Sequence, residues 1–317
     1  MTRETPALRR ARLLVLAALA VAAAGCGGGE PASPEAAATA PAASHAAPPA
    51  SPEIFAPGVI STVDAPEFGI AFSPDGETVY FNRTDRSRGT IDIYRAVRFG
   101  DGWAEPLPAP FASSFRDPDP FVSFDGRRVY FSSNRPMEGE TGDKASDFDI
   151  WYVERDGDTW GPAVNVAAVN SPAQEVYSTM TRDGALYFSS DRDGNTDIYM
   201  APPDGAGGFG TPVRLPAPLN SPDDDENNPL IAPDGSWLIF ASGRDGGVGE
   251  IDLYVSFHRD GAWSAPVNLG PGVNSEFAES APALGPDGQT LYFTSGRGGK
   301  GGDIYRMSLE AALAAAR

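Results

Sequence analysis

Short apolar runs rich in β-branched and aromatic residues alternate with polar turns along the chain from about residue 54 onward. Five of these runs each follow an Asp-Gly pair and end in an aromatic residue: Val79-Tyr80-Phe81, Val129-Tyr130-Phe131, Leu186-Tyr187-Phe188, Leu238-Ile239-Phe240 and Leu291-Tyr292-Phe293. Such runs are typical of β-strands. An Asp-Gly pair between apolar runs favours a tight hairpin, because glycine tolerates the positive φ that the turn demands. The pattern therefore predicts an all-β protein built from hairpins.

The hairpins belong to a longer repeat. The turn aspartates are separated by 50, 58, 51 and 53 residues, and they are Asp75, Asp125, Asp183, Asp234 and Asp287. A further strand, preceded by an aspartate, follows in every repeat: Asp92-Ile93-Tyr94, Asp149-Ile150-Trp151, Asp197-Ile198-Tyr199, Asp252-Leu253-Tyr254 and Asp303-Ile304-Tyr305. Each unit supplies four short strands, which is the content of one β-propeller blade.

The two ends of the repeat region complement each other. The fifth unit lacks its fourth strand and ends in an Ala-rich stretch, residues 308–317, that predicts a helix. The stretch Phe55-Ala56-Pro57-Gly58-Val59 resembles the missing strand. We therefore expect residues 53–317 to form a five-bladed propeller of four-stranded antiparallel blades, in which an N-terminal strand completes the last blade and removes its free edge.

These motifs resemble the TolB-type, WD40-like propeller repeat of bacterial envelope proteins, a Pro-Asp type of repeat. The match is best in Pro286-Asp287-Gly288, in residues 291–295 with Arg297, and in Asp303-Ile304-Tyr305. The resemblance covers roughly residues 54–307. It implies a propeller that serves as a binding platform, and it does not define an activity, because one fold carries many functions.

The first 52 residues differ in character from the repeats. A basic stretch precedes an apolar run, residues 13–24, that would span roughly 18 Å as a helix, short of a bilayer core of about 30 Å. Residues 1–25 are therefore predicted to be a signal peptide. Ala23-Ala24-Gly25-Cys26 resembles a bacterial lipobox, which implies a lipidated Cys26 and, because Gly27 follows, the outer membrane facing the periplasm of a Gram-negative bacterium. The alternative is cleavage elsewhere with Cys26 unmodified. Residues 26–52, rich in Ala and Pro, are expected to be a disordered tether.

Composition excludes several classes of function. Lys and Arg total 24 against 43 Asp and Glu, and the net charge of −19 disfavours nucleic-acid binding. One cysteine rules out an intrachain disulfide and a thiolate metal cluster, and two histidines nearly exclude histidine-based catalysis. No nucleophile elbow, phosphate loop or zinc-protease motif is present, and no cofactor is predicted.

An acidic residue stands eight positions before every turn aspartate. These repeated acids are Glu67, Asp117, Glu175, Glu226 and Glu279. They fall where the innermost strand of each blade begins, so we expect a ring of carboxylates at one mouth of the central channel, surrounded by the variable loops, as the candidate binding site. The alternative is architectural: each carboxylate pairs with an arginine that follows the second strand. Those arginines are Arg135, Arg192, Arg244 and Arg297.

One loop resembles a calcium site. Oxygen-bearing side chains alternate at Asp191, Asp193, Asn195 and Asp197, but the EF-hand glycine and glutamate are missing at the sixth and twelfth places. A tight hairpin with polar side chains is the favoured interpretation.

The predicted function is a non-enzymatic, membrane-anchored binding module of the cell envelope, monomeric, that binds a protein, a peptide or an envelope polymer at the channel mouth. The alternative is a glycoside hydrolase, or a sugar-binding propeller, that uses carboxylates at the same mouth.

Overall fold

The structure is a computed structural model that describes residues 47–85, 90–136, 147–299 and 301–316. All of these residues belong to the compact unit Ala46–Arg317. The predicted signal peptide, the lipidation site Cys26 and most of the predicted tether lie outside the described residues. Within the described part, none of the helices has the length and apolar character needed to cross a membrane.

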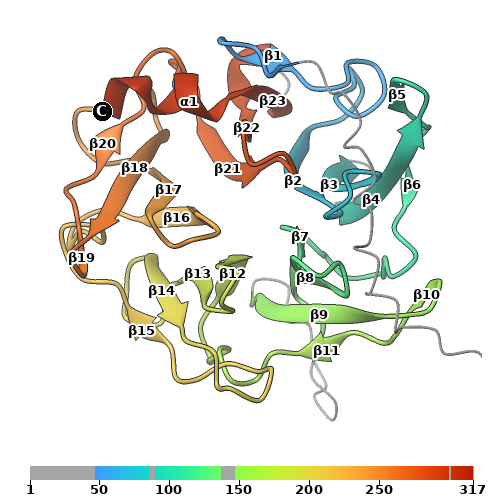
Figure 1. The fold of residues 1–317 in the computed structure, drawn as a ribbon, viewed down its shortest axis with the longest axis horizontal. Helices are drawn as coiled ribbons and strands as arrows, with labels where there is room; N and C mark the ends of the chain where they lie inside the picture. Colours follow the sequence, from blue (N-terminus) through green and yellow to red (C-terminus); the bar gives the residue numbers. More distant parts are fainter. Residues whose placement is uncertain (1–46, 86–89, 137–146, 300, 317) are drawn as a thin grey trace, which may run out of the picture. The chain divides into compact units, whose positions relative to one another are not determined.

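Five antiparallel sheets follow one another around a central channel (Figure 1). The first blade contains β2 (Glu67–Phe72), β3 (Thr78–Asp85), β4 (Thr90–Phe99), β5 (Gly102–Trp103) and β6 (Leu107–Pro108). The second contains β7 (Phe121–Val122), β8 (Arg128–Ser133), β9 (Asp149–Asp156), β10 (Thr159–Trp160) and β11 (Val164–Asn165). The third contains β12 (Glu175–Met180), β13 (Leu186–Ser190), β14 (Asp197–Ala201) and β15 (Val213–Arg214).

The fourth blade contains β16 (Glu226–Ile231), β17 (Trp237–Ser242), β18 (Asp252–Arg259), β19 (Ala262–Trp263) and β20 (Val267–Asn268). The fifth contains β21 (Glu279–Leu284), β22 (Thr290–Ser295), the 3-10 turn η1 (Gly296–Gly298), β23 (Asp303–Ser308) and β1 (Glu53–Ile54). In three blades the outer strand is split into two short pieces that pair with the same neighbour. The predicted all-β, five-bladed architecture is confirmed.

The ring is closed by an N-terminal strand, as predicted, but the strand is Glu53–Ile54, directly before the expected stretch, and residues 55–59 form a turn. Strand β1 pairs antiparallel with β23, with Glu53 opposite Arg306, and the Phe55 N–H donates to Ile304 O at 2.8 Å. The Phe55 ring packs edge-on against Tyr292 of the fifth blade and Trp103 of the first, at centroid distances of 5.0 and 6.0 Å. The first and last blades are therefore joined by both main-chain and side-chain contacts.

The C-terminal stretch is helical, in agreement with the prediction. Ser308 caps α1 (Leu309–Ala312) by accepting a hydrogen bond from Ala311 N, and a 3-10 turn, η2 (Leu313–Ala316), follows. Ala312 and Leu313 are buried against the fourth and fifth blades.

The hydrophobic core lies between neighbouring blades. Five clusters alternate with the five blades, and each second strand contributes one fully buried phenylalanine: Phe81, Phe131, Phe188, Phe240 and Phe293. Burial of one such ring contributes about 1.5–3 kcal/mol. Because each blade covers the face of the next, no blade can bury its apolar surface alone, and the innermost strands are held rigidly around the channel.

Candidate binding site in the central channel

The repeated acids lie where the innermost strands begin, as the sequence predicted, but they are buried. Glu67, Glu175, Glu226 and Glu279 open β2, β12, β16 and β21 with no exposed surface, and Asp117 is 2% exposed. They line no open rim. Each carboxylate is instead enclosed by strands of its own blade and by the segment that arrives from the preceding blade.

Every repeated acid pairs with an arginine. The N–O distances are 3.1 Å for Arg83–Glu67, 2.8 Å for Arg135–Asp117, 2.8 Å for Arg192–Glu175, 2.6 Å for Arg244–Glu226 and 3.2 Å for Arg297–Glu279. Four of these arginines were named in the architectural alternative. Arg83 was missed because it stands two residues after its buried phenylalanine, whereas the others stand four residues after theirs.

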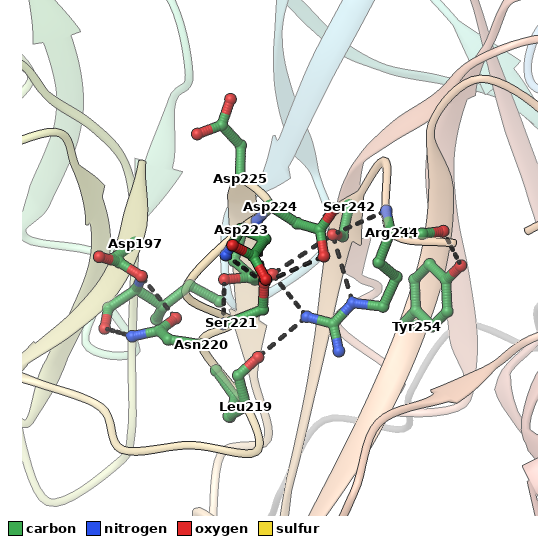
Figure 2. A network of polar contacts seen from close by, with 12 residues as sticks. Asp197, Leu219, Asn220, Ser221, Asp223, Asp224, Asp225, Ser242, Arg244 and Tyr254 are labelled. Carbon is green, nitrogen blue, oxygen red and sulfur yellow. Dashed lines mark hydrogen bonds and ion pairs between the residues drawn. The ribbon is translucent and has the colours of Figure 1, made fainter. Parts of the chain in front are cut away.

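Figure 2 shows this arrangement in the fourth blade. The Arg244 guanidinium donates to Glu226 Oε1 at 2.6 Å and to Leu219 O at 2.9 Å. The other carboxylate oxygen, Oε2, accepts the Ser221 N–H at 2.8 Å, and the Tyr254 hydroxyl donates to Arg244 O at 3.2 Å. Burial raises the pKa of Glu226, and Arg244 opposes that rise. The pair therefore connects the segment between β15 and β16, which includes Leu219 and Ser221, to the fourth blade. This connecting role favours the architectural alternative.

The side chains of the calcium-like loop do not converge on one point. Asp191 accepts from Gln174 N at 2.8 Å, Asp193 accepts from the Tyr199 hydroxyl, and Asp197 forms a bidentate pair with Arg214. Asn195 donates to Asp224 O at 2.7 Å. Among the described residues, no group of three or more His, Cys, Asp or Glu side chains is arranged to hold a metal ion. This geometry matches the polar hairpin interpretation.

A cavity of about 250 Å³ lies in the central channel and is lined by all five innermost strands. We call it the channel cavity. It extends from the middle of those strands to the Asp-Gly turns that follow them, an end of the channel that we call the turn face. Most of its wall is apolar: Ile70, Phe72, Phe121, Met180, Leu230, Ile231 and Leu284. The repeated acids stand at the opposite ends of the same strands, so the cavity opens away from the mouth that the sequence had suggested.

The floor of the cavity follows from a feature shared by all five blades. Two residues after each repeated acid, the backbone has positive φ: Gly69 (51°), Asp119 (63°), Tyr177 (52°), Asn228 (52°) and Ala281 (49°). In β2, β12, β16 and β21 the register with the second strand shifts at this point, as in a β-bulge. The residue type differs in every blade. The bulge itself is therefore architectural. Because its residue differs in every blade, the side chains at this level of the channel differ from blade to blade, whereas the repeated acids do not.

Asp119 is the carboxylate of this floor. Its Oδ2 accepts from Ser132 Oγ at 3.1 Å, and its own N–H donates to Asn82 Oδ1 at 2.8 Å. The side chain keeps partial contact with the cavity, while the surrounding protein excludes most water. Burial raises the pKa of Asp119 to about 6, against the lowering effect of hydrogen bonds from Ser132 and the Tyr177 main chain. Asp119 therefore changes charge close to neutral pH.

Tyr177 crosses the channel. It belongs to the third blade, and its hydroxyl donates to Pro282 O of the fifth blade at 2.7 Å. Burial raises the pKa of Tyr177 well above 10, so the phenol is neutral at physiological pH. This contact ties two blades that are not neighbours and closes the floor beside Asp119.

Ser178, the next residue, presents a hydroxyl without a hydrogen-bond partner in the described structure. The side chain lines the cavity and the residue is 3% exposed. The equivalent positions of the second, fourth and fifth blades hold proline, which has no N–H to leave unpaired at the inner edge of a sheet. A buried hydroxyl without a partner costs about 1–3 kcal/mol. A ligand that entered the cavity would recover that energy.

Arg182 stands at the mouth. Its exposed guanidinium stacks on Phe124, 4.6 Å from the ring centroid, and the main-chain N–H of Arg182 donates to Pro233 O at 2.8 Å. Two open grooves reach the same arginine, one toward Tyr130 and Phe209 and the other toward Trp237. The turn face therefore carries a deep apolar cavity with a groove on either side of Arg182.

No family model matches the sequence, and a search of the curated proteins gives no match. Solved structures do match. A protein assigned as TolB from Agrobacterium tumefaciens is 22% identical, with 72% of this chain and 69% of that chain aligned and a TM-score of 0.48. An α-L-arabinofuranosidase from Lactobacillus brevis is 12% identical over 77% of this chain and 90% of its own, with a TM-score of 0.50. A gluconolactonase from Xanthomonas campestris is 14% identical over 83% and 97%, with a TM-score of 0.46.

The described part of this chain is a five-bladed β-propeller, as the repeats predicted, and the structures similar to it include one assigned as TolB. A propeller fold does not by itself define a function, so the function must be argued from the side chains of the channel.

Proposed function

We propose that this protein is a non-enzymatic binding module that holds an extended segment of a partner protein or peptide across its turn face, with one side chain inserted into the channel cavity. The observation that carries the proposal is the junction at Arg182, where the cavity lined by all five blades meets two grooves. A continuous surface of this form fits a chain with a projecting group. The apolar wall favours an inserted group with an apolar body over a sugar ring with hydroxyls on both faces.

The glycoside hydrolase alternative gains no support from the channel cavity. Retaining and inverting hydrolases both use two carboxylates, about 5–9.5 Å apart, that flank the scissile bond. Among the described residues that line the cavity, Asp119 alone carries a carboxylate. The repeated acids are committed to arginines and have almost no exposed surface. Binding without hydrolysis is the function that these side chains support best.

A library of random hexapeptides displayed on phage, selected on the purified protein, tests the proposal. Peptides enriched by selection should lose at least tenfold in affinity for Met180→Trp, because the indole fills the cavity, and for Arg182→Ala. Val213→Trp is the matched control, since it adds the same ring to an exposed position (57%) on β15 of the same blade. If the enriched peptides bind Met180→Trp and the unaltered protein equally well, the channel cavity is not their site and the proposal is wrong.

The membrane anchor belongs to the same proposal. The support is the sequence of residues 1–26, in which the apolar run leads to Cys26 and the Ala/Pro-rich stretch follows. A thioether-linked diacylglycerol with an N-terminal acyl chain would anchor the protein stably, because two or more chains suffice. Growth with labelled palmitate should label the protein and leave Cys26→Ser unlabelled and released from the membrane fraction. A labelled Cys26→Ser protein would contradict this anchor.

A further inference from the structure

Asp119, the carboxylate on the floor of the channel cavity, lacks, among the described residues, the arginine partner that every repeated acid has. The groups that act on the pKa of Asp119 are Ser132 and the Tyr177 main chain, and no arginine or lysine of the described residues is among them. By contrast, all five repeated acids have arginine partners within 3.2 Å. A buried carboxylate without a cation is costly, and a ligand cation would remove that cost.

Space over this carboxylate is kept open by glycine. The equivalent residue of the first blade is Gly69, and a Cβ added there would lie 3.8 Å from Asp119 Oδ1 and 3.0 Å from Asn82 Oδ1. A side chain at residue 69 would therefore contact Oδ1 of Asp119, whereas Ser132 binds Oδ2. Asp119 itself lines the channel cavity.

We propose that the group inserted into the channel cavity is the side chain of a lysine carried by the partner segment, an inference that rests on the proposed function. The four-carbon stem of the lysine lies along the apolar wall, and its ammonium group binds Asp119 Oδ1 and the hydroxyl of Ser178. An ammonium ion offers three donors from one point, which suits a carboxylate and a hydroxyl that line the same cavity. An arginine is a poorer fit, because its planar fork is matched to both oxygens of a carboxylate and Oδ2 is taken.

Two further observations agree with this choice. The net charge of −19 attracts basic segments from a distance and raises their association rate. The unpartnered Ser178 hydroxyl of the same cavity supplies a second oxygen for the ammonium group. A neutral apolar tip, such as leucine, would leave both Asp119 and Ser178 without compensation.

The groups packed around Asp119 define how such binding depends on pH. They are Asn82 on β3, Ser132 on β8 and Tyr177 on β12, with Gly69 on β2 opposite. None of these side chains is charged near neutral pH, because the pKa of Tyr177 lies well above 10. Asp119 is therefore the group whose ionisation controls the affinity for a cation, with a pKa of about 6 in the free protein. Affinity for the cation should be constant well above that pH and fall below it, until the contribution of the charge is lost.

Two blocked peptides that differ only at the tip of one side chain provide the test. Acetyl-Gly-Lys-Gly-amide carries the ammonium group, and its norleucine analogue has the same stem without the charge. Calorimetry or NMR titration at pH 7.5 should give an affinity about tenfold higher for the lysine peptide, the value of one charge-assisted hydrogen bond to a desolvated carboxylate. The advantage should disappear in Asp119→Asn and at pH 5, and it should shrink in Ser178→Ala.

Asp75→Asn is the control for charge, because Asp75 is exposed at a turn of the same face and lines neither the channel cavity nor the two grooves. It should keep the lysine preference. Equal affinity of the two peptides, or a preference that survives Asp119→Asn, would overturn the lysine assignment. If the norleucine peptide still binds and Met180→Trp abolishes its binding, the proposed function stands without the lysine. If neither peptide binds and phage selection also fails, both proposals fall.

Discussion

At the scale of single residues, the repeated motif is explained by one arginine. In the third blade, the Arg192 guanidinium lies 5.4 Å from the Phe188 ring centroid and 4.8 Å from that of Tyr199, while it pairs with Glu175. This one cation therefore contacts the phenylalanine of the second strand, the tyrosine of the third and the acid of the first. The same contacts recur in the other blades, which is why these residue types return at fixed offsets.

The first prediction concerns this cation. Glu175→Gln leaves Arg192 largely buried without its charge partner, so we expect the free energy of unfolding to fall by about 3 kcal/mol. Glu154→Gln is the matched control, because Glu154 pairs with Arg127 and Arg128 at the surface, where the loss should be below about 1 kcal/mol. Urea unfolding followed by tryptophan fluorescence measures both. Equal losses in the two variants would contradict the architectural role of the repeated acids.

Asp119 gives a second prediction, on pH. Its pKa rises from 3.8 to about 6 on folding, so the folded protein binds more protons than the unfolded chain between these values. Stability therefore decreases as pH rises from about 4 to 6, and the penalty remains above pH 6. Asp119→Asn removes this penalty. From pH 4 to pH 7 the variant should gain of the order of 2 kcal/mol relative to the unaltered protein. A difference that stays constant across this range in chemical unfolding would rule out the raised pKa.

At the scale of elements, the bulge of each innermost strand depends on the blade before it. The bulge N–H donates to a polar side chain of the preceding second strand in four blades: Gly69 to Thr294, Asp119 to Asn82, Tyr177 to Ser132 and Asn228 to Ser189. Before the fifth blade that position is Ala241, which has no acceptor. Ala281 N donates instead to Asn228 Oδ1, at 3.4 Å. The Asn228 side chain thus supplies the hydrogen-bond acceptor that Ala241 lacks.

This substitution predicts a compensating pair. Asn228→Ala should lower the free energy of unfolding by about 1–3 kcal/mol, because the buried Ala281 N–H loses its acceptor. Ala241→Ser should restore most of that loss, since it returns the hydroxyl that three other blades use in this position. A double-mutant cycle measured by urea unfolding gives the coupling between the two positions. Additive effects would show that Ala281 N–H does not depend on either side chain.

At the scale of the whole molecule, stability depends on closure of the ring. Phe55 is 5% exposed and contacts both the first and the last blade through Trp103 and Tyr292. The main-chain bond from Phe55 N to Ile304 O holds the same segment. Because the contacts with Tyr292 and Ile304 join residues about 240–250 positions apart, we expect them to form late in folding and to hold the ring together once formed.

Phe55→Ala should therefore cost about 3–5 kcal/mol, the usual loss for removing a buried phenylalanine. Amide hydrogen exchange should accelerate most in the first and fifth blades, which lose their common neighbour. Phe99→Ala is the control, because Phe99 is 77% exposed at the end of β4, and its effect should lie within about 0.5 kcal/mol. Uniform acceleration across all five blades would show that the ring unfolds as one unit instead.

Much of the fold was predictable because the same pattern of Asp-Gly turns and apolar runs occurs five times along the chain. The Asp-Gly turns, the apolar runs and the missing fourth strand together predicted blade number, closure by an N-terminal strand and the C-terminal helix, and the structure confirms all three. The candidate site was harder to predict. Asp119, Tyr177 and Ser178 were missed, although a signal exists: two positions after each repeated acid, the residue type differs in every blade.

The sequence by itself determined the element order, the number of blades, the five repeated acids and four of their five arginines, because turn chemistry and apolar runs act between residues close along the chain. Only the tertiary structure decided which of the acids a ligand can reach. Burial and pairing depend on residues brought together from different blades, so the five repeated carboxylates became internal connections while one unrepeated carboxylate, Asp119, was left facing a cavity.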